Sequence, residues 1–196
     1  MKIKLCGLFR DEDVLAANRA KPDYVGWVFA PSRRQVSAEW ARQARQRLDA
    51  GIPAVGVFVD EAVERVAALL NEGVIDIAQL HGSEGEDYIA RLQGETGKPV
   101  VKAVRVAGPE DVARHLESRA DYLLLDAGAG QGMAFDWRWI GAPGRPFFLA
   151  GGISLENIDR ARALNPFAVD VSSGAETGGV KDEQKMLELV RRAHDE

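Results

Sequence analysis

The sequence alternates between short apolar runs and longer stretches in which apolar residues recur every three or four positions. The short runs are rich in β-branched residues and are apolar at successive positions, which is typical of parallel strands buried on both faces. The pattern predicts eight strands, at residues 3–8, 24–30, 54–60, 77–81, 100–106, 122–126, 147–151 and 168–172.

The longer stretches between the strands have the periodicity of amphipathic helices. They predict helices at residues 38–49, 61–71, 84–94, 109–117, 155–164 and 182–193. Ser37, Ser83 and Ser154 stand where helices begin, and their hydroxyls suit the N-cap position. Pro109 suits a first helical position, and Asn157 follows Ser154 at the spacing of a capping box, although Glu or Gln is usual there.

Strands that alternate with helices predict a parallel sheet with right-handed crossovers. Eight such strands form either a closed barrel or an open doubly wound sheet. An open sheet that binds a dinucleotide has a glycine-rich motif after its first strand, whereas the corresponding segment here is only Cys6-Gly7. We therefore predict an α/β fold, a (β/α)8 TIM barrel with short loops. No linker or change in composition divides the chain, so we expect residues 1–196 to form a single domain.

Composition excludes several classes of function. The 196 residues carry a net charge of −5 without a basic stripe, so we expect no nucleic-acid partner. The longest apolar runs have the length of strands and are too short to span a bilayer. The chain enters its first strand directly from Met1, and its one cysteine cannot form an internal disulfide. We therefore expect a cytoplasmic protein.

Polar residues stand at the carboxyl ends of the predicted strands, where barrel active sites are built. Strands 1 and 6 are three steps apart around the ring, so Cys6 and Asp126 would face each other across the mouth. A thiol and a carboxyl in that arrangement can move protons without a metal or a cofactor. The sequence has no metal-ligand spacing and no nucleophile-elbow or Walker motif. The strand ends carry, in chain order, Cys6, residues 30–34, Asp60, His81, Arg105, Asp126, Gly151, Gly152 and residues 172–174.

Two neighbouring strands end in glycine and serine, at Gly151-Gly152 and Ser173-Gly174. Small residues leave backbone N–H groups accessible, and the loops after strands 7 and 8 are where barrels usually bind phosphate. The sequence therefore indicates a phosphorylated small-molecule ligand.

Each candidate side chain also has a purely structural interpretation. A lone cysteine in a strand is usually a small buried hydrophobe, and Asp126 lies two residues before a glycine, where aspartate often forms a turn. His81 can cap the end of its strand, and Arg34 can be either a solvated surface charge or an anion ligand. On the residues alone, these alternatives stay open.

Nine short segments along the whole chain stand in the order found in one enzyme family. They are Lys4-Leu-Cys-Gly7, Ser32-Arg-Arg34, Val55-Gly-Val-Phe-Val59, Gln79-Leu-His-Gly82, Leu124-Leu-Asp126, Phe135-Asp-Trp137, Leu149-Ala-Gly-Gly152, Asp170-Val-Ser-Ser-Gly174 and Lys181-Asp182. Each segment is unspecific alone, but the ordered set resembles the phosphoribosylanthranilate isomerases of tryptophan biosynthesis. The resemblance implies a (β/α)8 barrel that needs no cofactor and catalyses an Amadori rearrangement.

The resemblance also implies the reaction, from N-(5-phosphoribosyl)anthranilate to 1-(2-carboxyphenylamino)-1-deoxyribulose 5-phosphate. Asp126 matches the family's general acid, which protonates the ring oxygen of the sugar. Cys6 matches its general base, which removes the C2 proton. Arg34 matches an arginine on the anthranilate side, and we place His81 with it among the substrate-binding residues. The residues that would hold the phosphate are Gly151, Gly152, Ser173 and Gly174.

Lys4 precedes Cys6 by two residues and so points to the same side of the strand. A free thiol has a pKa of about 8.5, so Cys6 must be partly ionised to act as a base. We hypothesise that the charge of Lys4 favours this ionisation.

The chain departs from the family in three places. Phe9 stands where Thr is common, Ala175 replaces Val, and the strand-6 loop at residues 129–134 lacks a Lys and two Thr and is several residues short. Because that loop closes over the substrate in the family, we expect altered affinity or closure.

Two other functions stay open. A non-catalytic barrel that binds phosphosugars would keep the fold without turnover. The second alternative is the related isomerase of the histidine pathway, or an enzyme that accepts both substrates. The histidine-pathway isomerase uses the same chemistry, but its fold has carboxylates where this chain has Cys6 and Arg105. In each case the partner is a phosphorylated small molecule, a sugar–anthranilate in the favoured interpretation. We expect a monomer or a homodimer that binds neither nucleic acid nor membrane.

Overall fold

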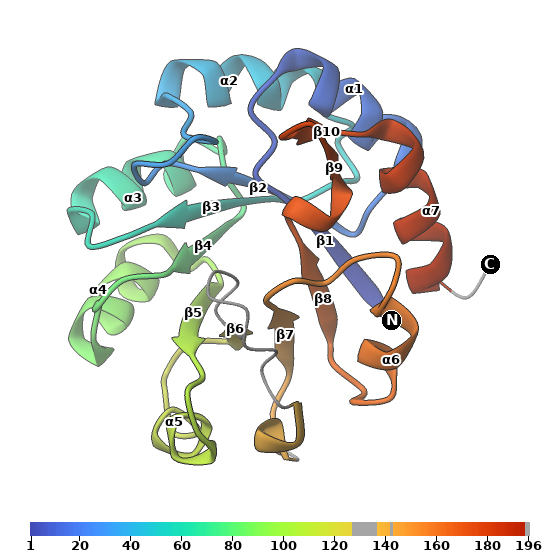
Figure 1. The fold of residues 1–196 in the computed structure, drawn as a ribbon. Helices are drawn as coiled ribbons and strands as arrows, with labels where there is room; N and C mark the ends of the chain where they lie inside the picture. Colours follow the sequence, from blue (N-terminus) through green and yellow to red (C-terminus); the bar gives the residue numbers. More distant parts are fainter. Residues whose placement is uncertain (127–136, 142, 195–196) are drawn as a thin grey trace.

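Eight parallel strands form a closed barrel in chain order, as the sequence predicts (Figure 1). The computed structural model describes residues 1–126, 137–141 and 143–194. The barrel closes where the first strand pairs with the eighth, with Lys2 opposite Ala168. The strands are β1 (Lys2–Cys6), β2 (Tyr24–Val28), β3 (Ala54–Phe58), β4 (Ile77–Leu80), β5 (Val100–Arg105), β6 (Tyr122–Asp126), β7 (Phe147–Ala150) and β8 (Ala168–Val171).

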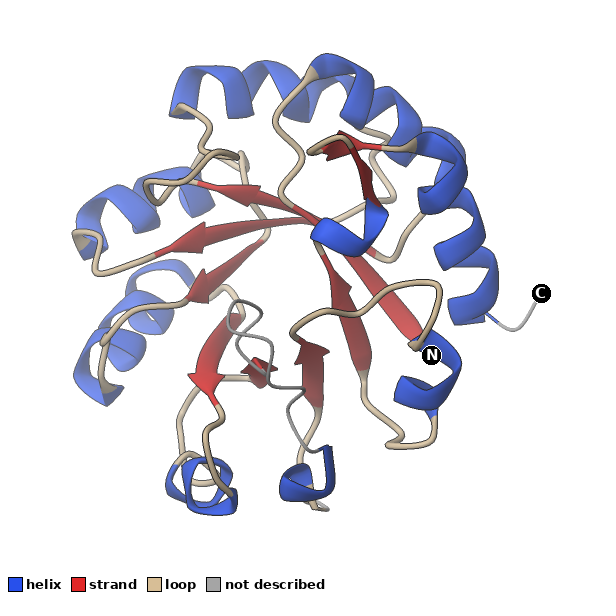
Figure 2. Ribbon diagram, viewed as in Figure 1, coloured by secondary structure: helices blue, strands red, loops and turns tan. Residues whose placement is uncertain are grey.

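Helices surround the strands on the outside of the barrel, and the last helix, α7, packs beside the first, α1 (Figure 2). A two-stranded hairpin of β9 and β10 precedes α7. The helices are α1 (Asp11–Ala20), α2 (Ala38–Arg47), α3 (Val63–Asn71), α4 (Glu86–Thr96), α5 (Pro109–Arg114), α6 (Ile158–Arg162) and α7 (Glu183–His194). The short elements are the 3₁₀ turns η1 (Trp137–Ile140) and η2 (Ser173–Ala175), and the strands β9 (Glu176–Thr177) and β10 (Val180–Lys181).

Alternate residues of each strand enter two separate cores, which explains the continuous apolar runs in the sequence. In β6, Leu123 and Leu125 pack in the large core between strands and helices. Leu124 packs instead with Val55, Val101 and other residues inside the barrel. Most positions on both faces of the strands are therefore apolar, and the buried polar exceptions include Lys4, Gln79 and Lys102.

Aromatic rings fill the barrel at the end where the strands begin. Tyr24 and Tyr122 are the first residues of β2 and β6, and both rings pack against Phe148 at 5.7 and 5.6 Å between centroids. Phe167, just before β8, joins them with its centroid 4.8 Å from that of Tyr122. Because this end is filled with apolar side chains, the opposite end remains for the polar residues.

The predicted helix starts are partly correct. The Ser37 hydroxyl accepts a hydrogen bond from the Trp40 N–H at 3.0 Å, and Pro109 is the first residue of α5. Ser83 was expected to cap α4, and this is wrong because its hydroxyl and N–H both donate to Asp60 and the helix begins only at Glu86.

The start of α6 lies later than the sequence predicts. The chain makes a turn from Ser154, and the helix begins at Ile158, with Asn157 at the N-cap. The expected reciprocal contact is present, since the Ser154 N–H donates to Asn157 Oδ1 at 2.9 Å. Ser154 therefore opens the turn that leads into the helix and does not cap the helix itself.

Two elements were not anticipated from the sequence, helix α1 and the β9–β10 hairpin. The start of α1 is capped by a side chain inside its first turn, where Asp13 accepts from the N–H groups of Phe9 and Arg10 at 3.1 Å each.

No helix within the described part of the chain is long and apolar enough to cross a membrane.

Candidate active site

A cavity of about 810 Å³ opens at the carboxyl ends of the strands. It collects most of the residues that the sequence analysis placed in the site. Gly174 is the exception, since it adjoins the lining residue Ser173 but does not itself line the cavity. The lining residues include Cys6, Arg34, His81, Asp126, Gly151, Gly152 and Ser173, together with Gln79, Arg105, Asp170 and Ser172.

Cys6 and Asp126 reach this cavity from opposite walls. Cys6 is the last residue of β1 and Asp126 the last of β6, and two strands separate them on the shorter way round the barrel. Cys6 is 7% exposed, and Gly26 lies opposite it on β2. A Cβ atom at Gly26 would lie 2.7 Å from the Cys6 sulfur, so the glycine makes room for the thiol.

Lys4 is fully buried beneath Cys6 and forms an ion pair with Asp170 at 2.9 Å. Burial works against the charge of Lys4, but Asp170 and Cys6 together more than offset this and raise the pKa of Lys4. Burial raises the pKa of the Cys6 thiol, and the positive charge of Lys4 opposes that rise without cancelling it. The hypothesis that Lys4 favours the thiolate is therefore right in direction, but burial has the larger effect.

A chain of polar contacts connects Lys4 to Asp126 across the barrel. Lys4 Nζ donates to Gln79 Oε1 at 2.9 Å, and Gln79 Nε2 lies 3.0 Å from His81 Nδ1. His81 Nε2 lies 3.3 Å from Asp126 Oδ2. His81 thus contacts the carboxyl group directly at the mouth of the cavity.

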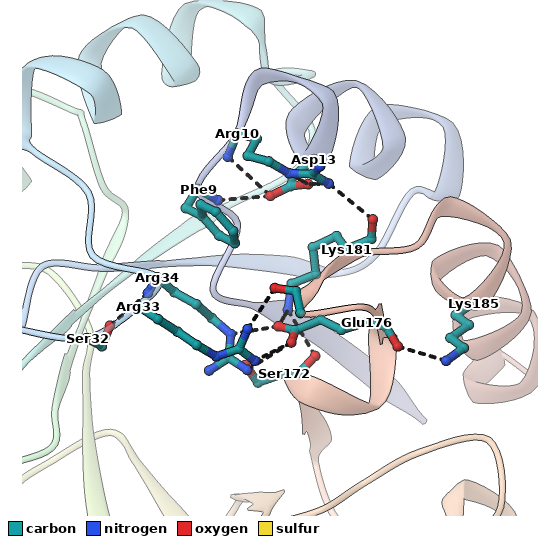
Figure 3. A network of polar contacts seen from close by, with 11 residues as sticks. Phe9, Arg10, Asp13, Ser32, Arg33, Arg34, Ser172, Glu176, Lys181 and Lys185 are labelled. Atoms are coloured by element: carbon teal, nitrogen blue, oxygen red, sulfur yellow. Dashed lines mark hydrogen bonds and ion pairs between the residues drawn. The ribbon is translucent and has the colours of Figure 1, made fainter.

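Arg34 is held in a cluster of cations around one buried carboxylate (Figure 3). Glu176 accepts from Arg34 Nε at 2.6 Å, from Arg34 Nη2 at 3.1 Å and from Lys181 Nζ at 3.0 Å, and it also pairs with Arg33. Burial works against the charge of Glu176, but the hydrogen bonds from Arg34 and Lys181 hold its pKa at about 2. The cluster joins the loop after β2 to the hairpin after β8.

The two glycine-containing rims lie side by side, as expected from the sequence. Gly151 and Gly152 follow β7 with φ of 92° and 71°, a left-handed conformation that favours glycine. A Cβ atom at Gly174 would lie 2.0 Å from the carbonyl oxygen of Ile153. Only glycine at this position lets the loop after β8 approach the loop after β7 so closely.

The three departures from the family pattern have different surroundings. Phe9 is half-buried and packs against the outer core, while Ala175 is fully buried. The loop at residues 129–134 lies outside the described residues.

The groups of His, Cys, Asp and Glu in the described ranges include none that could hold a metal ion.

Several polar residues of the site were missed by the sequence analysis. Asp170 and Gln79 were quoted only as parts of motifs, yet both point into the barrel two residues before a site residue, a period-two signal that could have identified them. Glu176 and Lys181 gave no such signal, because they meet Arg34 only through the folding of a hairpin onto a distant loop.

The fold and the cavity define a barrel enzyme of the (β/α)8 class, with a thiol and a carboxyl facing one cavity at the carboxyl ends of the strands. The model of the family N-(5′-phosphoribosyl)anthranilate (PRA) isomerase matches residues 3–192. An N-(5′-phosphoribosyl)anthranilate isomerase from Endomicrobium trichonymphae is 46% identical over 196 residues, covering 97% of this chain and 96% of that one.

Solved structures agree with this assignment. The phosphoribosyl anthranilate isomerase of Thermotoga maritima has a TM-score of 0.91 at 34% identity, with 100% of both chains covered. A structure of such an isomerase in complex with reduced 1-(o-carboxyphenylamino)-1-deoxyribulose 5-phosphate has a TM-score of 0.88 at 34% identity, again covering 100% of both chains. The chain belongs to the phosphoribosylanthranilate isomerase family. It is an isomerase of tryptophan biosynthesis, and its substrate is a small phosphorylated sugar.

Proposed function

We propose that Asp126 is the general acid and Cys6 the general base of an Amadori rearrangement. Asp126 protonates the ring oxygen of N-(5′-phosphoribosyl)anthranilate, the bond from that oxygen to C1 breaks, and a Schiff base forms between C1 and the nitrogen. The thiolate of Cys6 then removes the C2 proton, which gives an enolamine. Tautomerisation yields 1-(2-carboxyphenylamino)-1-deoxyribulose 5-phosphate, so the reaction changes no atom count and no net oxidation state.

The observation that supports this most is that Cys6 and Asp126 line one cavity from opposite walls of the barrel. An acid and a base on opposite sides can act on the ring oxygen and on C2 of the same bound sugar. The active form of Cys6 is the thiolate, and Lys4 and Lys181 are the cations whose charges lower the pKa of the thiol.

The remaining site residues are proposed to bind the substrate. Arg34 would bind the anthranilate carboxylate through the guanidinium N–H groups that Glu176 leaves available, and a planar guanidinium suits that ligand. His81 lies beside Asp126 and would contact the sugar at the reacting end. The phosphate would bind to the backbone of Gly151, Gly152, Ser173 and Gly174.

The experiment is a comparison of wild type with Cys6→Ala and Asp126→Asn, following the loss of substrate fluorescence. We expect each variant to lose at least about 100-fold in kcat, because general acid and base groups typically contribute 10²- to 10⁴-fold. Binding of the reduced product analogue, measured by calorimetry, should be nearly unchanged in both. An inert wild type that still binds the analogue would instead favour the non-catalytic barrel. Full turnover by either variant would refute its assigned role.

We further propose that residues 1–196 form one domain that works in the cytoplasm as a monomer or a homodimer. The single domain is supported by the pairing of β1 with β8, which draws both ends of the chain into one barrel. A buried, unpaired Cys6 is compatible with a reducing compartment. A relative from Thermotoga maritima is described as dimeric, and light scattering on the purified protein would distinguish the two states.

A further inference from the structure

Gln79 occupies an unusual position for an amide side chain. It lies on β4 inside the barrel, is 2% exposed, and has a hydrogen-bond partner at each end of its amide group. One partner is the ammonium group of Lys4 and the other is the imidazole of His81. A buried polar group with both ends engaged has only one orientation that satisfies both partners.

That orientation follows from the chemistry of the partners. An ammonium group has donors and no acceptor, so the oxygen of Gln79 must face Lys4. Lys4 is held charged in place by its ion pair with Asp170. The amide nitrogen of Gln79 therefore faces His81 Nδ1 as a donor, and Nδ1 must carry the lone pair.

The tautomer of His81 follows in turn. A neutral imidazole with a lone pair on Nδ1 carries its hydrogen on Nε2. Nε2 is the atom that lies 3.3 Å from Asp126 Oδ2. An imidazolium would place a second N–H against the Gln79 amide, which cannot accept it while Lys4 holds the oxygen. His81 thus presents a neutral N–H donor to Asp126.

We propose that Gln79 is a positioning residue that, together with Lys4, fixes His81 as the Nε2–H tautomer so that His81 donates a hydrogen bond to Asp126. This inference rests on the proposed role of Asp126 as general acid. With Oδ2 accepting from His81, the acid carries its transferable proton on Oδ1. After the proton moves to the substrate, the N–H of His81 stabilises the carboxylate that remains.

The test uses Gln79→Glu, which replaces the amide donor by a second acceptor. The carboxylate can still accept a hydrogen bond from Lys4, and it also accepts one from His81 when the hydrogen of the imidazole is on Nδ1. In that tautomer Nε2 carries the lone pair, and this lone pair faces Asp126. The tautomer is measured from the imidazole nitrogen shifts in two-bond proton–nitrogen spectra, with the His81 signal assigned by a His81→Asn variant. We expect Nε2–H in wild type and Nδ1–H in Gln79→Glu.

The kinetic expectation is a fall in kcat of about 10- to 100-fold in Gln79→Glu, the range for loss of a hydrogen bond to a charged group. Binding of the reduced product analogue should stay within about twofold, because the substrate contacts remain. Gln184→Glu, which makes the same change on an exposed position of α7, serves as the control and should match wild type. Gln79→Met keeps the volume without a donor and should lose kcat with a mixture of tautomers.

Three results would overturn the inference. They are an Nδ1–H tautomer in the wild-type protein, an unchanged kcat in Gln79→Glu, and a changed kcat without any change of tautomer. The wild-type spectrum decides the first point even if Gln79→Glu does not fold. If Asp126→Asn keeps full turnover, the proposed general acid is wrong. If Asp126→Asn is inactive while Gln79→Glu is fully active, only the positioning role is wrong.

Discussion

The Glu176 cluster predicts a specific loss of stability on replacing Glu176 by Gln. The side chain of Glu176 is 4% exposed and receives hydrogen bonds from Arg34 and Lys181, with Arg33 as a further cation. The substitution keeps the shape but removes the carboxylate that pairs with Arg33, Arg34 and Lys181 in the network shown in Figure 3. Lys181, which is itself buried, then loses its charged acceptor and has neutral ones in its place, the Ser172 carbonyl and the amide oxygen of the new glutamine.

The magnitude follows from the pKa of Glu176. Burial alone would raise this pKa, but the hydrogen bonds and charges of the cations lower it from an ordinary value of 4.5 to about 2. A difference of this size corresponds to about 3 kcal/mol at 1.36 kcal/mol per pKa unit. Arg33 is half-exposed, so solvent screening reduces the expected contribution to about 2–3 kcal/mol.

The sign of the pH dependence is fixed because the pKa of Glu176 is lower in the folded protein than in the unfolded chain. The stabilisation is fully present above pH 4.5 and is lost as the pH falls toward 2. Glu176→Gln should therefore be less stable than wild type by about 2–3 kcal/mol near neutral pH, and this difference should shrink in acid.

The assay is urea unfolding followed by tryptophan fluorescence, at neutral pH and at about pH 3. Glu188→Gln is the matched control, since the pKa of Glu188 is also lowered to about 2 but by Arg191 and Arg192 on the solvent-facing side of α7. That variant should differ little from wild type, because exposed ion pairs contribute little. Equal free energies of unfolding for wild type and Glu176→Gln at neutral pH, or a difference that persists in acid, would refute the reasoning.

Three further predictions concern the barrel rim, the thiol and a helix. Gly174→Ala places a Cβ 2.0 Å from the carbonyl oxygen of Ile153, so it should separate the two rims and raise KM at least about tenfold, seen as weaker binding of the product analogue. Lys4→Met removes a charge that lowers the pKa of Cys6, so the rise of kcat/KM with pH should move to higher pH, and an unchanged profile would contradict this. Gly94→Ala lies within α4 with no atom near the added methyl, so it should stabilise the protein by about 0.5–1 kcal/mol in the same urea assay.

Much of the fold was predictable from the sequence because it depends on local and periodic signals. All eight strands were found, since strands buried on both faces are apolar at successive residues. Their observed ends lie up to two residues from the predicted ones. Helix α1 was missed because its N-terminus is capped from within, by Asp13, and no Ser or Thr precedes it. The prediction that Ser83 caps a helix was wrong for the opposite reason. A serine is present there, but its hydroxyl donates to the carboxylate of Asp60 on a neighbouring loop.

The sequence by itself determined the positions at which chemistry can occur, because the carboxyl ends of barrel strands meet at one rim whatever the details of packing. Cys6 and Asp126 were placed in one cavity on that ground alone. Tertiary structure decided what surrounds each of them. The bond between Lys4 and Gln79 joins residues 75 positions apart, and the pair of Lys4 with Asp170 joins residues 166 positions apart. Such contacts depend on strand register and on burial around the whole barrel. They set the charge, the tautomer and the pKa of the side chains in the site, and no local pattern in the sequence encodes them.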